Sequence, residues 1–293
     1  MSASPFQRFI PFLAVLGSVT ALGVGTSWAK QALFPVVGAQ GTTAVRVGLS
    51  ALLMLMLWRP WRWRLSRADA QAVALYGAAL GAMNLMFYLS LQTLPFGLAV
   101  AIEFAGPLAV AIWSSRRAVD FVWVALAIAG LALLLPLGLS GSTLDPLGVL
   151  YAVGAAVFWA LYIVFGKRAG HLHAGQSVSL GLLVAALVVV PVGVAHAGAA
   201  LLSHSVLLVG VAVAAISSAL PISLEMMALK RLPKEAFGIM ISMEPAVAAL
   251  LALALLGERL DTVQWLAIGC IVAASMGSAA TARRLPAVQA QPA

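Results

Sequence analysis

Long apolar segments dominate this sequence and restrict the structures it can form. A helix that crosses a lipid bilayer needs about 20 consecutive, mostly apolar residues. Such segments follow one another along the chain, separated by charged residues, proline or glycine, and we expect ten spanning helices at residues 9–29, 38–58, 71–91, 96–114, 118–137, 147–166, 176–196, 205–228, 236–256 and 263–282. None has the alternating pattern of roughly ten residues that is typical of a membrane β-strand. The sequence therefore predicts an all-α membrane protein.

The composition agrees with a chain that faces lipid more than water. Of the 293 residues, 63% are apolar and 9% are charged, whereas soluble domains carry about 25% charged residues. So few charges cannot cover a water-facing surface, which excludes a water-soluble enzyme. The single cysteine, Cys270, excludes a disulfide-bonded secreted scaffold.

The basic residues indicate the orientation, because cytoplasmic loops are enriched in lysine and arginine. With a cytoplasmic N-terminus, Lys30 and Arg259 lie on the opposite side and Arg46 lies within a span. The other 14 of the 17 basic residues face the cytoplasm: Arg8, Arg59, Arg62, Arg64, Arg67, Arg116, Arg117, Lys167, Arg168, Lys230, Arg231, Lys234, Arg283 and Arg284. We therefore expect both termini in the cytoplasm, and we interpret the net charge of +8 as a sign of topology rather than of nucleic-acid binding.

The first span is expected to remain in the mature protein. Its apolar stretch is longer than the roughly 7–15 residues of a signal peptide, and no clear cleavage motif of small residues precedes the next span.

Two segments of similar sequence indicate an internal repeat. Phe96-Gly97 precedes Glu103 by the same spacing with which Phe237-Gly238 precedes Glu244. The preceding sequences, LQTLP at 91–95 and LKRLP at 229–233, also match, and a Trp-Ala pair recurs at 28–29 and 159–160. A chance similarity between alanine-rich helices is the alternative interpretation.

The repeat divides the chain into two units of five spans. We expect the first unit at residues 1–140, the second at 146–282 and a cytoplasmic tail at 283–293. Because five is odd, the second unit enters the membrane from the opposite side, so the two form an inverted repeat. Transporters with inverted repeats bind their substrates near the bilayer midplane, between the two units.

Five ionisable residues lie where lipid or protein should surround them: Lys30, Arg46, Glu103, Glu225 and Glu244. A charge at mid-membrane costs at least about 2.5–3.5 kcal/mol, so each one needs a reason. Lys30 is close enough to the end of its span to reach the interface, whereas we expect Arg46 to face the bundle interior and to pair with a carboxylate.

Two cations cannot neutralise three carboxylates, so at least one glutamate lacks an internal cationic partner. Burial without such a partner favours the protonated form of a carboxyl group. This suits coupling to protons, but it also suits a protonated glutamate that is hydrogen-bonded to a neighbour and has no role in transport. Pro221 and Pro245 lie beside Glu225 and Glu244, where we expect interrupted helices, the usual place of a transporter's binding site.

Four uncharged residues are candidates for the walls of a cavity. Asn84 and Tyr88 lie four apart on one helix face, and Trp159 and Tyr162 lie three apart on another span. Together they offer amide, hydroxyl and indole donors. The alternative is that the aromatic residues only pack or anchor the helices.

No motif for enzymatic chemistry, a cofactor or a metal accompanies these residues. The chain lacks a Walker loop, GxGxxG, HExxH and a GxSxG with catalytic partners. His171-x-His173 has no nearby cysteine or carboxylate to complete a metal site. We therefore expect no enzyme activity, no cofactor and no bound metal.

Several segments resemble the drug/metabolite transporter superfamily, in particular its EamA-type members and, among them, the threonine/homoserine exporter group. The similarity is carried by FYLSLQTLPFGLAVAIEFAGPLAVAIWSSRRAVDFVW at 87–123, SLEMMALKRLPKEAFGIMISMEPAVAALLALALLGERL at 223–260, RPWRWR at 59–64 and AASMGS at 273–278. The resemblance implies a multi-pass protein of the bacterial inner membrane that exports small neutral amino acids, driven by the proton gradient.

The residues themselves suggest how such a cargo would bind. We expect Arg46 to hold the carboxylate of an amino acid, and Glu103 or Glu244 to take its ammonium group or the coupling proton. The ion-coupling candidates are Glu103, Glu225 and Glu244, and the cavity walls are Asn84, Tyr88, Trp159 and Tyr162. Export of another metabolite (an aromatic amino acid, a nucleoside or a cationic drug), a non-transporting membrane scaffold and a homodimer packed through helix glycines all remain open.

Overall fold

The computed structural model describes residues 5–62, 64–113, 118–134, 144–169, 172–229 and 240–281, and within them every regular element is helical. The elements of the first half are α1 (Pro5–Ala32), α2 (Phe34–Trp58), η1 (Pro60–Arg62), α3 (Arg67–Ser90), α4 (Phe96–Glu103), α5 (Ala105–Trp113) and α6 (Ala118–Leu134). The second half contains α7 (Pro146–Arg168), α8 (Ala174–Ala197), η2 (Gly198–Leu202), α9 (His204–Ala214), η3 (Ala215–Ala219), α10 (Leu220–Leu229), α12 (Glu244–Leu251), η4 (Ala252–Leu256) and α13 (Thr262–Thr281).

These helices coincide with the expected spans. Among the described residues, five helices are long and apolar enough to cross a membrane: Ile10–Ala32, Phe34–Trp58, Arg67–Ser90, Pro146–Arg168 and Gly175–Leu202. The shorter apolar helices lie in the other five expected spans, at Phe96–Val110, Phe121–Gly130, His204–Ser218, Glu244–Leu256 and Thr262–Ser278. The expectation of an all-helical membrane protein is confirmed.

Three of the expected spans are interrupted. The fourth is divided at Phe104 into α4 and α5, three residues before Pro107. The eighth and ninth contain the π-helical turns η3 and η4, which often mark functional sites. Residues 236–239 at the start of the ninth, with Phe237-Gly238 of the repeat, lie outside the described residues. Glu244 nevertheless opens α12 directly before Pro245, so the helix begins where the proline favours a first turn.

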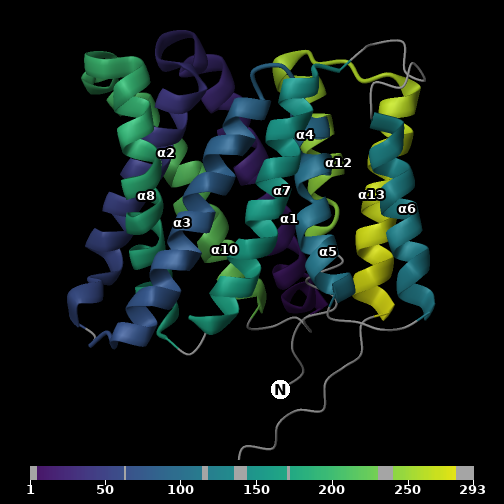
Figure 1. Ribbon diagram of the computed structural model, residues 1–293, viewed down its shortest axis with the longest axis horizontal. Coiled ribbons are helices and arrows are strands. Elements are labelled where there is room, and N and C mark those ends of the chain that lie inside the picture. Colours follow the sequence, from purple (N-terminus) through teal and green to yellow (C-terminus); the bar gives the residue numbers. More distant parts are fainter. Residues whose placement is uncertain are drawn as a thin grey trace, which may run out of the picture.

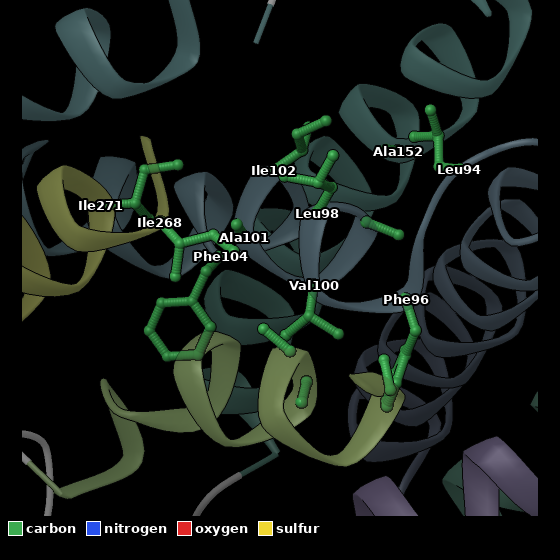
Figure 2. Packing of buried hydrophobic residues seen from close by; sticks show 14 of the residues in the cluster. Leu94, Phe96, Leu98, Val100, Ala101, Ile102, Phe104, Ala152, Ile268 and Ile271 are labelled. Atoms are coloured by element: carbon green, nitrogen blue, oxygen red, sulfur yellow. The ribbon is translucent and has the colours of Figure 1, made fainter. Parts of the chain in front are cut away.

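The helices stand side by side in a broad bundle (Figure 1). α2 packs along α8 at one edge and α6 packs along α13 at the other, while α1, α4, α7 and α12 lie between them. α4 is apolar on all sides except Glu103, and each of its residues is buried, as expected for a helix enclosed by others. Figure 2 shows the surrounding core, in which Phe96, Leu98 and Ile102 pack with residues of α7, α12 and α13.

A polar contact outside the expected spans fixes the start of α7. Asp145 is its N-cap, and the carboxylate accepts a hydrogen bond of 3.0 Å from the backbone N–H of Gly148. A hydrogen bond with the side chain of Thr93, together with this backbone bond, lowers the pKa of Asp145. The connection after α3 is thereby tied to the start of α7.

α4 and α12 approach each other closely at a glycine. A Cβ atom added to Gly97 would lie 2.5 Å from Cβ and 2.6 Å from Cα of Ala249. Since the second atom belongs to the backbone, a rotamer change cannot relieve the overlap. The crossing therefore requires glycine at position 97.

We predict that Gly97→Ala lowers the free energy of unfolding by about 1–3 kcal/mol, because the two helices must move apart to accept the methyl group. Thermal unfolding in detergent measures the effect. Gly269→Ala is the matched control, since an added Cβ there meets nothing within 4 Å. Equal unfolding temperatures for the two variants would contradict the close crossing.

Candidate functional site

Four of the five ionisable residues that the sequence places within the spans, all except Lys30, meet at one cavity of about 290 Å³. Side chains from α1, α2, α3, α4, α7, α10 and α12 line it. Of the eight residues that the sequence analysis proposed, seven are among them: Arg46, Asn84, Glu103, Trp159, Tyr162, Glu225 and Glu244. The structure thus brings together residues that are up to 198 positions apart (244 − 46) in the sequence.

Arg46 lies at the midpoint of α2 and is held by uncharged partners. Its Nη1 donates to Oδ1 of Asn84 (2.6 Å), its Nε to the hydroxyl of Ser217 (2.9 Å) and its Nη2 to the carbonyl of Ser217 (3.4 Å). A guanidinium has five N–H donors. Within the described residues, one donor on each terminal nitrogen is therefore left for another acceptor.

The ring of Tyr88 packs against the guanidinium of Arg46 and does not line the cavity. The Cζ atom of Arg46 lies 5.4 Å from the centroid of the Tyr88 ring, within the range of a cation–π contact. The tyrosine is fully buried, and its ring packs against Phe34 and Phe87. Tyr88 thus supports Arg46, whereas the sequence predicted that it would line the cavity.

The expected ion pair between Arg46 and a carboxylate does not form among the described residues, where the single ion pair within 4 Å joins Lys30 to Glu258. Glu103 is only 6% exposed, and it lines the same cavity as Glu244 and Arg46. Asn84 and Ser217 instead accept hydrogen bonds from three of the five N–H donors of Arg46. The prediction was wrong because the amide and the two serine oxygens were not recognised as partners.

Glu225 has a different environment from the other two carboxyl groups. Its Oε1 accepts a hydrogen bond of 2.7 Å from the hydroxyl of Ser18, which also approaches the carbonyl of Pro221 at 3.3 Å. Ser18 is fully buried on α1. The carboxyl group of Glu225 is thus tied to α1, whereas the carboxyl groups of Glu103 and Glu244 form no hydrogen bond with other described residues.

A second cavity of about 330 Å³ adjoins the first. The two share Leu22, Arg46, Met83, Asn84, Tyr162 and Glu225. The polar residues that line only the second cavity are Ser50, Tyr76, Ser217 and Ser218. The sequence analysis did not propose them, although two signals were present: Ser50 follows Arg46 by one helical turn, and Ser217-Ser218 is a polar pair in an apolar segment just before Pro221.

His173 has a structural role. Its Nδ1 accepts a hydrogen bond from the backbone N–H of Gly175 at the start of α8 (3.2 Å), and its ring lies 5.6 Å from that of Trp58. His171 lies outside the described residues. Within those residues, no group of three or more His, Cys, Asp or Glu side chains could hold a metal ion.

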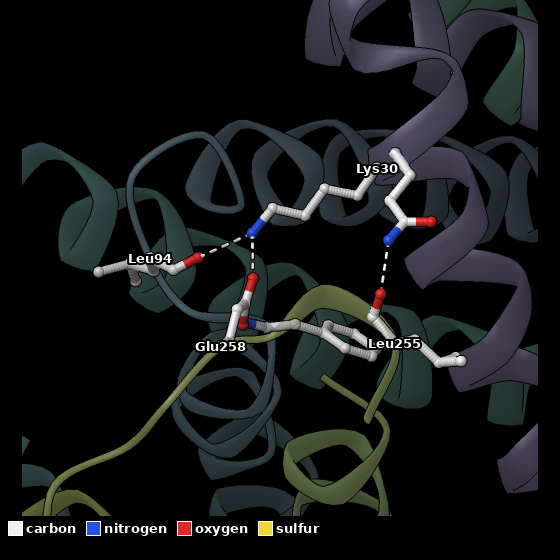
Figure 3. A network of polar contacts seen from close by, with 6 residues as sticks. Lys30, Leu94, Leu255 and Glu258 are labelled. Carbon is white, nitrogen blue, oxygen red and sulfur yellow. Dashed lines mark hydrogen bonds and ion pairs between the residues drawn. The ribbon is translucent and has the colours of Figure 1, made fainter. Parts of the chain in front are cut away.

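At the end of the bundle opposite the N-terminus, an ion pair joins the end of α1 to the segment that follows η4 (Figure 3). Lys30, near the end of α1, donates to Oε1 of Glu258 at 2.6 Å and approaches the carbonyl of Leu94 at 3.5 Å. Gly257 ends η4 in the left-handed conformation (φ +67°), which glycine adopts without strain. Oε2 of Glu258 accepts a hydrogen bond of 2.6 Å from the backbone N–H of Phe96, the first residue of α4.

Glu258 thus neutralises Lys30 and satisfies a free donor at the N-terminus of α4. The sequence analysis expected Lys30 to reach the membrane interface and did not identify Glu258. The ring of Phe96 lines the first cavity. The ion pair therefore closes the bundle directly beside that cavity.

We predict that Lys30→Met and Glu258→Gln each lower the unfolding temperature and that their effects are not additive. The side chains are 22% and 17% exposed, so the coupling should exceed the roughly 0.2–1 kcal/mol of exposed pairs. A double-mutant cycle of thermal unfolding in detergent measures it. Arg259→Gln, which removes an exposed charge from the same segment, is the control; purely additive effects would rule out the pair.

Comparison with known proteins identifies the family. The EamA-like transporter family matches residues 146–279. The chain is 50% identical to the threonine/homoserine exporter RhtA of Escherichia coli strain K12 over 276 residues, which cover 94% of this chain and 93% of that protein. The corresponding exporter of Salmonella typhimurium strain SL1344 is also 50% identical, over 96% of this chain and 95% of its own.

A solved structure supports the fold alone. It has a TM-score of 0.56 and 19% sequence identity, and the match covers 94% of this chain and 96% of the other. The family relationship is carried by the high identity over nearly the whole length of the exporters. The chain is thus a multi-pass protein of the bacterial inner membrane that belongs to the EamA-like transporters of the drug/metabolite transporter superfamily, with RhtA-like proteins as its relatives.

Proposed function

We propose that the protein is a secondary exporter that moves small neutral amino acids, such as threonine and homoserine, out of the cytoplasm. In this proposal, proton antiport drives an alternating-access cycle. The relatives named as threonine/homoserine exporters support the cargo class.

The observation that carries the proposal is the state of Arg46. Its three hydrogen bonds go to neutral groups, so its positive charge is not cancelled by an anion within 4 Å among the described residues. The two remaining donors are on different terminal nitrogens, which is the arrangement that binds both oxygens of a carboxylate. An amino acid would supply the missing anion.

The carboxyl groups of the first cavity are suited to the other end of the cargo. Glu103 and Glu244 line the same cavity as Arg46 without forming a hydrogen bond to another described residue. An ammonium group between them would relieve their mutual repulsion. Intramembrane carboxylates are also the groups with which transporters bind and release protons, so exchange of an ammonium group for a proton at this pair would couple export to proton entry.

The packing of the helices supports an inverted repeat. If each span of the first half is matched with the fifth span after it, α2–α8, α4–α12 and α6–α13 are contacts between matched helices. The contact of α3 with α7 has its counterpart in α10 with α1, that of α3 with α8 in α9 with α2, and that of α4 with α7 in α12 with α1. Such an exchange is expected of two units related by a two-fold axis in the membrane plane.

The same relationship suggests how the protein would alternate between two states. The first cavity is lined by both halves, and the ion pair of Lys30 with Glu258 joins the halves at one end. Its rupture would allow that end to open. We place both termini in the cytoplasm, because the basic loops then lie on the cytoplasmic side.

We predict that Arg46→Gln reduces transport of labelled threonine into proteoliposomes by about 30-fold or more, because charge-assisted hydrogen bonds to the carboxylate are lost. Arg46→Lys should be intermediate, since it keeps the charge but not the paired donors. Arg259→Gln is the control for loss of a positive charge. Threonine transport by Arg46→Gln at the wild-type rate would contradict the proposal, and undiminished transport of a cationic compound would favour that class of cargo.

We predict that Glu103→Gln abolishes threonine accumulation driven by an imposed pH gradient while the protein remains folded. The amide cannot exchange a proton, but it keeps the size of the side chain. The measurement compares gradient-driven uptake with exchange of internal for external threonine at equal pH. Full gradient-driven uptake by the folded variant would exclude Glu103 as the coupling residue.

A further inference from the structure

The second cavity differs chemically from the first. Glu103 and Glu244 line only the first cavity, whereas four hydroxyl-bearing residues line only the second: Ser50, Tyr76, Ser217 and Ser218. Arg46, Asn84, Tyr162 and Glu225 belong to both. A molecule whose carboxylate is bound at Arg46 therefore has Glu103 and Glu244 on one side and the serine hydroxyl groups on the other.

Two of the three serines form a pair that does not hold Arg46. Ser217 accepts a hydrogen bond from Arg46 and donates one of 2.7 Å to the carbonyl of Val213, so its single O–H donor is used. The hydroxyl of Ser50 donates to that of Ser218 at 2.9 Å. Within the described residues, this pair retains one O–H donor and free lone pairs for a third partner.

The backbone places the pair about one helical turn from Arg46. Ser50 lies four residues after Arg46 on α2, about 6 Å further along the same face. The π-helical turn of η3 directs Ser217 to Arg46 and its neighbour Ser218 to Ser50. Because Arg46, Ser50 and Ser218 line the same cavity, an amino acid bound at Arg46 can present a side-chain hydroxyl group to the pair.

Aromatic rings close the side of this cavity that faces α7 and α8. The rings of Tyr76 and Tyr162 are stacked with centroids 4.9 Å apart and an interplanar angle of 29°. A Cβ atom added to Gly181 would overlap the Tyr76 ring, and one added to Gly166 would lie 3.3 Å from it. The Tyr76 ring thus packs closely against two helices, and Gly181 leaves the room that it needs.

We infer that the hydroxyl pair of Ser50 and Ser218 is the specificity-determining subsite, which binds the side-chain hydroxyl of the cargo and selects hydroxylated amino acids over their apolar isosteres. This inference rests on the proposed function and extends it to the side chain. A site that provides hydrogen-bonding partners for a hydroxyl group rejects an analogue without one, because its own polar groups are left unpaired. Ser217, in contrast, is a positioning residue that acts through Arg46.

The test measures the inhibition of labelled-threonine uptake by unlabelled threonine, valine, homoserine and norvaline in proteoliposomes. Valine and norvaline have a methyl group where the other two have a hydroxyl. For Ser218→Ala and Ser50→Ala we expect the apparent affinity for threonine and homoserine to fall about 3- to 10-fold, the effect of one neutral hydrogen bond. The affinities for valine and norvaline should stay constant or rise.

Two variants control for structural effects. Ser179→Ala removes another buried hydroxyl, which bonds to the carbonyl of Gly175 on its own helix and lines neither cavity, so it should not change the selectivity. Ser218→Thr keeps the hydroxyl group and should retain the preference for threonine.

The outcomes separate this inference from the proposed function. If uptake depends on Arg46 but the serine variants weaken all four amino acids equally, the hydroxyl subsite is refuted and the exporter proposal stands. Equal affinities of the wild-type protein for threonine and valine would likewise refute the hydroxyl subsite and leave the exporter proposal standing. If the folded wild type transports none of the four, both proposals fail.

Discussion

A guanidinium group in the middle of a membrane helix is stable only where other groups replace the water that it loses, and this requirement fixes the interior of the protein. Arg46 receives an amide from α3, two oxygens from the π-helical turn η3 and the face of Tyr88. These partners come from both halves of the chain. Because each is neutral or aromatic, they lower the cost of burying the cation without cancelling its charge.

The sequence was sufficient to predict the spans and most of the residues at the cavity, because charged side chains in apolar segments are costly and therefore conspicuous. Arg46, Glu103, Glu225 and Glu244 were found in this way. The partners of these residues could not be found so easily, since serines such as Ser217 are common in membrane helices and carry no signal of their own. Tyr88 is a second example. Helical spacing predicted that it lies on the same face as Asn84, but its contact with the guanidinium of Arg46 depends on how the helices pack and could not be predicted.

Interruptions of regular helix accompany the functional groups in both halves. α4 ends at Glu103, α12 begins at Glu244, and η3 presents Ser217 and Ser218. A regular helix uses its backbone carbonyls internally, whereas an interrupted one can direct them to other groups, as the carbonyl of Ser217 illustrates. The break at Phe104 accompanies Pro107, which has no N–H to bond the carbonyl of Glu103 four residues earlier and therefore disturbs the helix at that point.

Phe96 links the ion pair at the end of the bundle to the cavity, since its backbone N–H is bound by Glu258 and its ring borders the cavity. A ligand whose binding shifts the start of α4 would therefore also strain the contacts of Glu258 at the end of the bundle. Thermodynamic linkage makes this relation reciprocal: the free energy that holds Lys30 and Glu258 together is subtracted from the binding of any ligand that requires their separation. The strength of one ion pair thus helps to set the apparent affinity of a site that it does not touch.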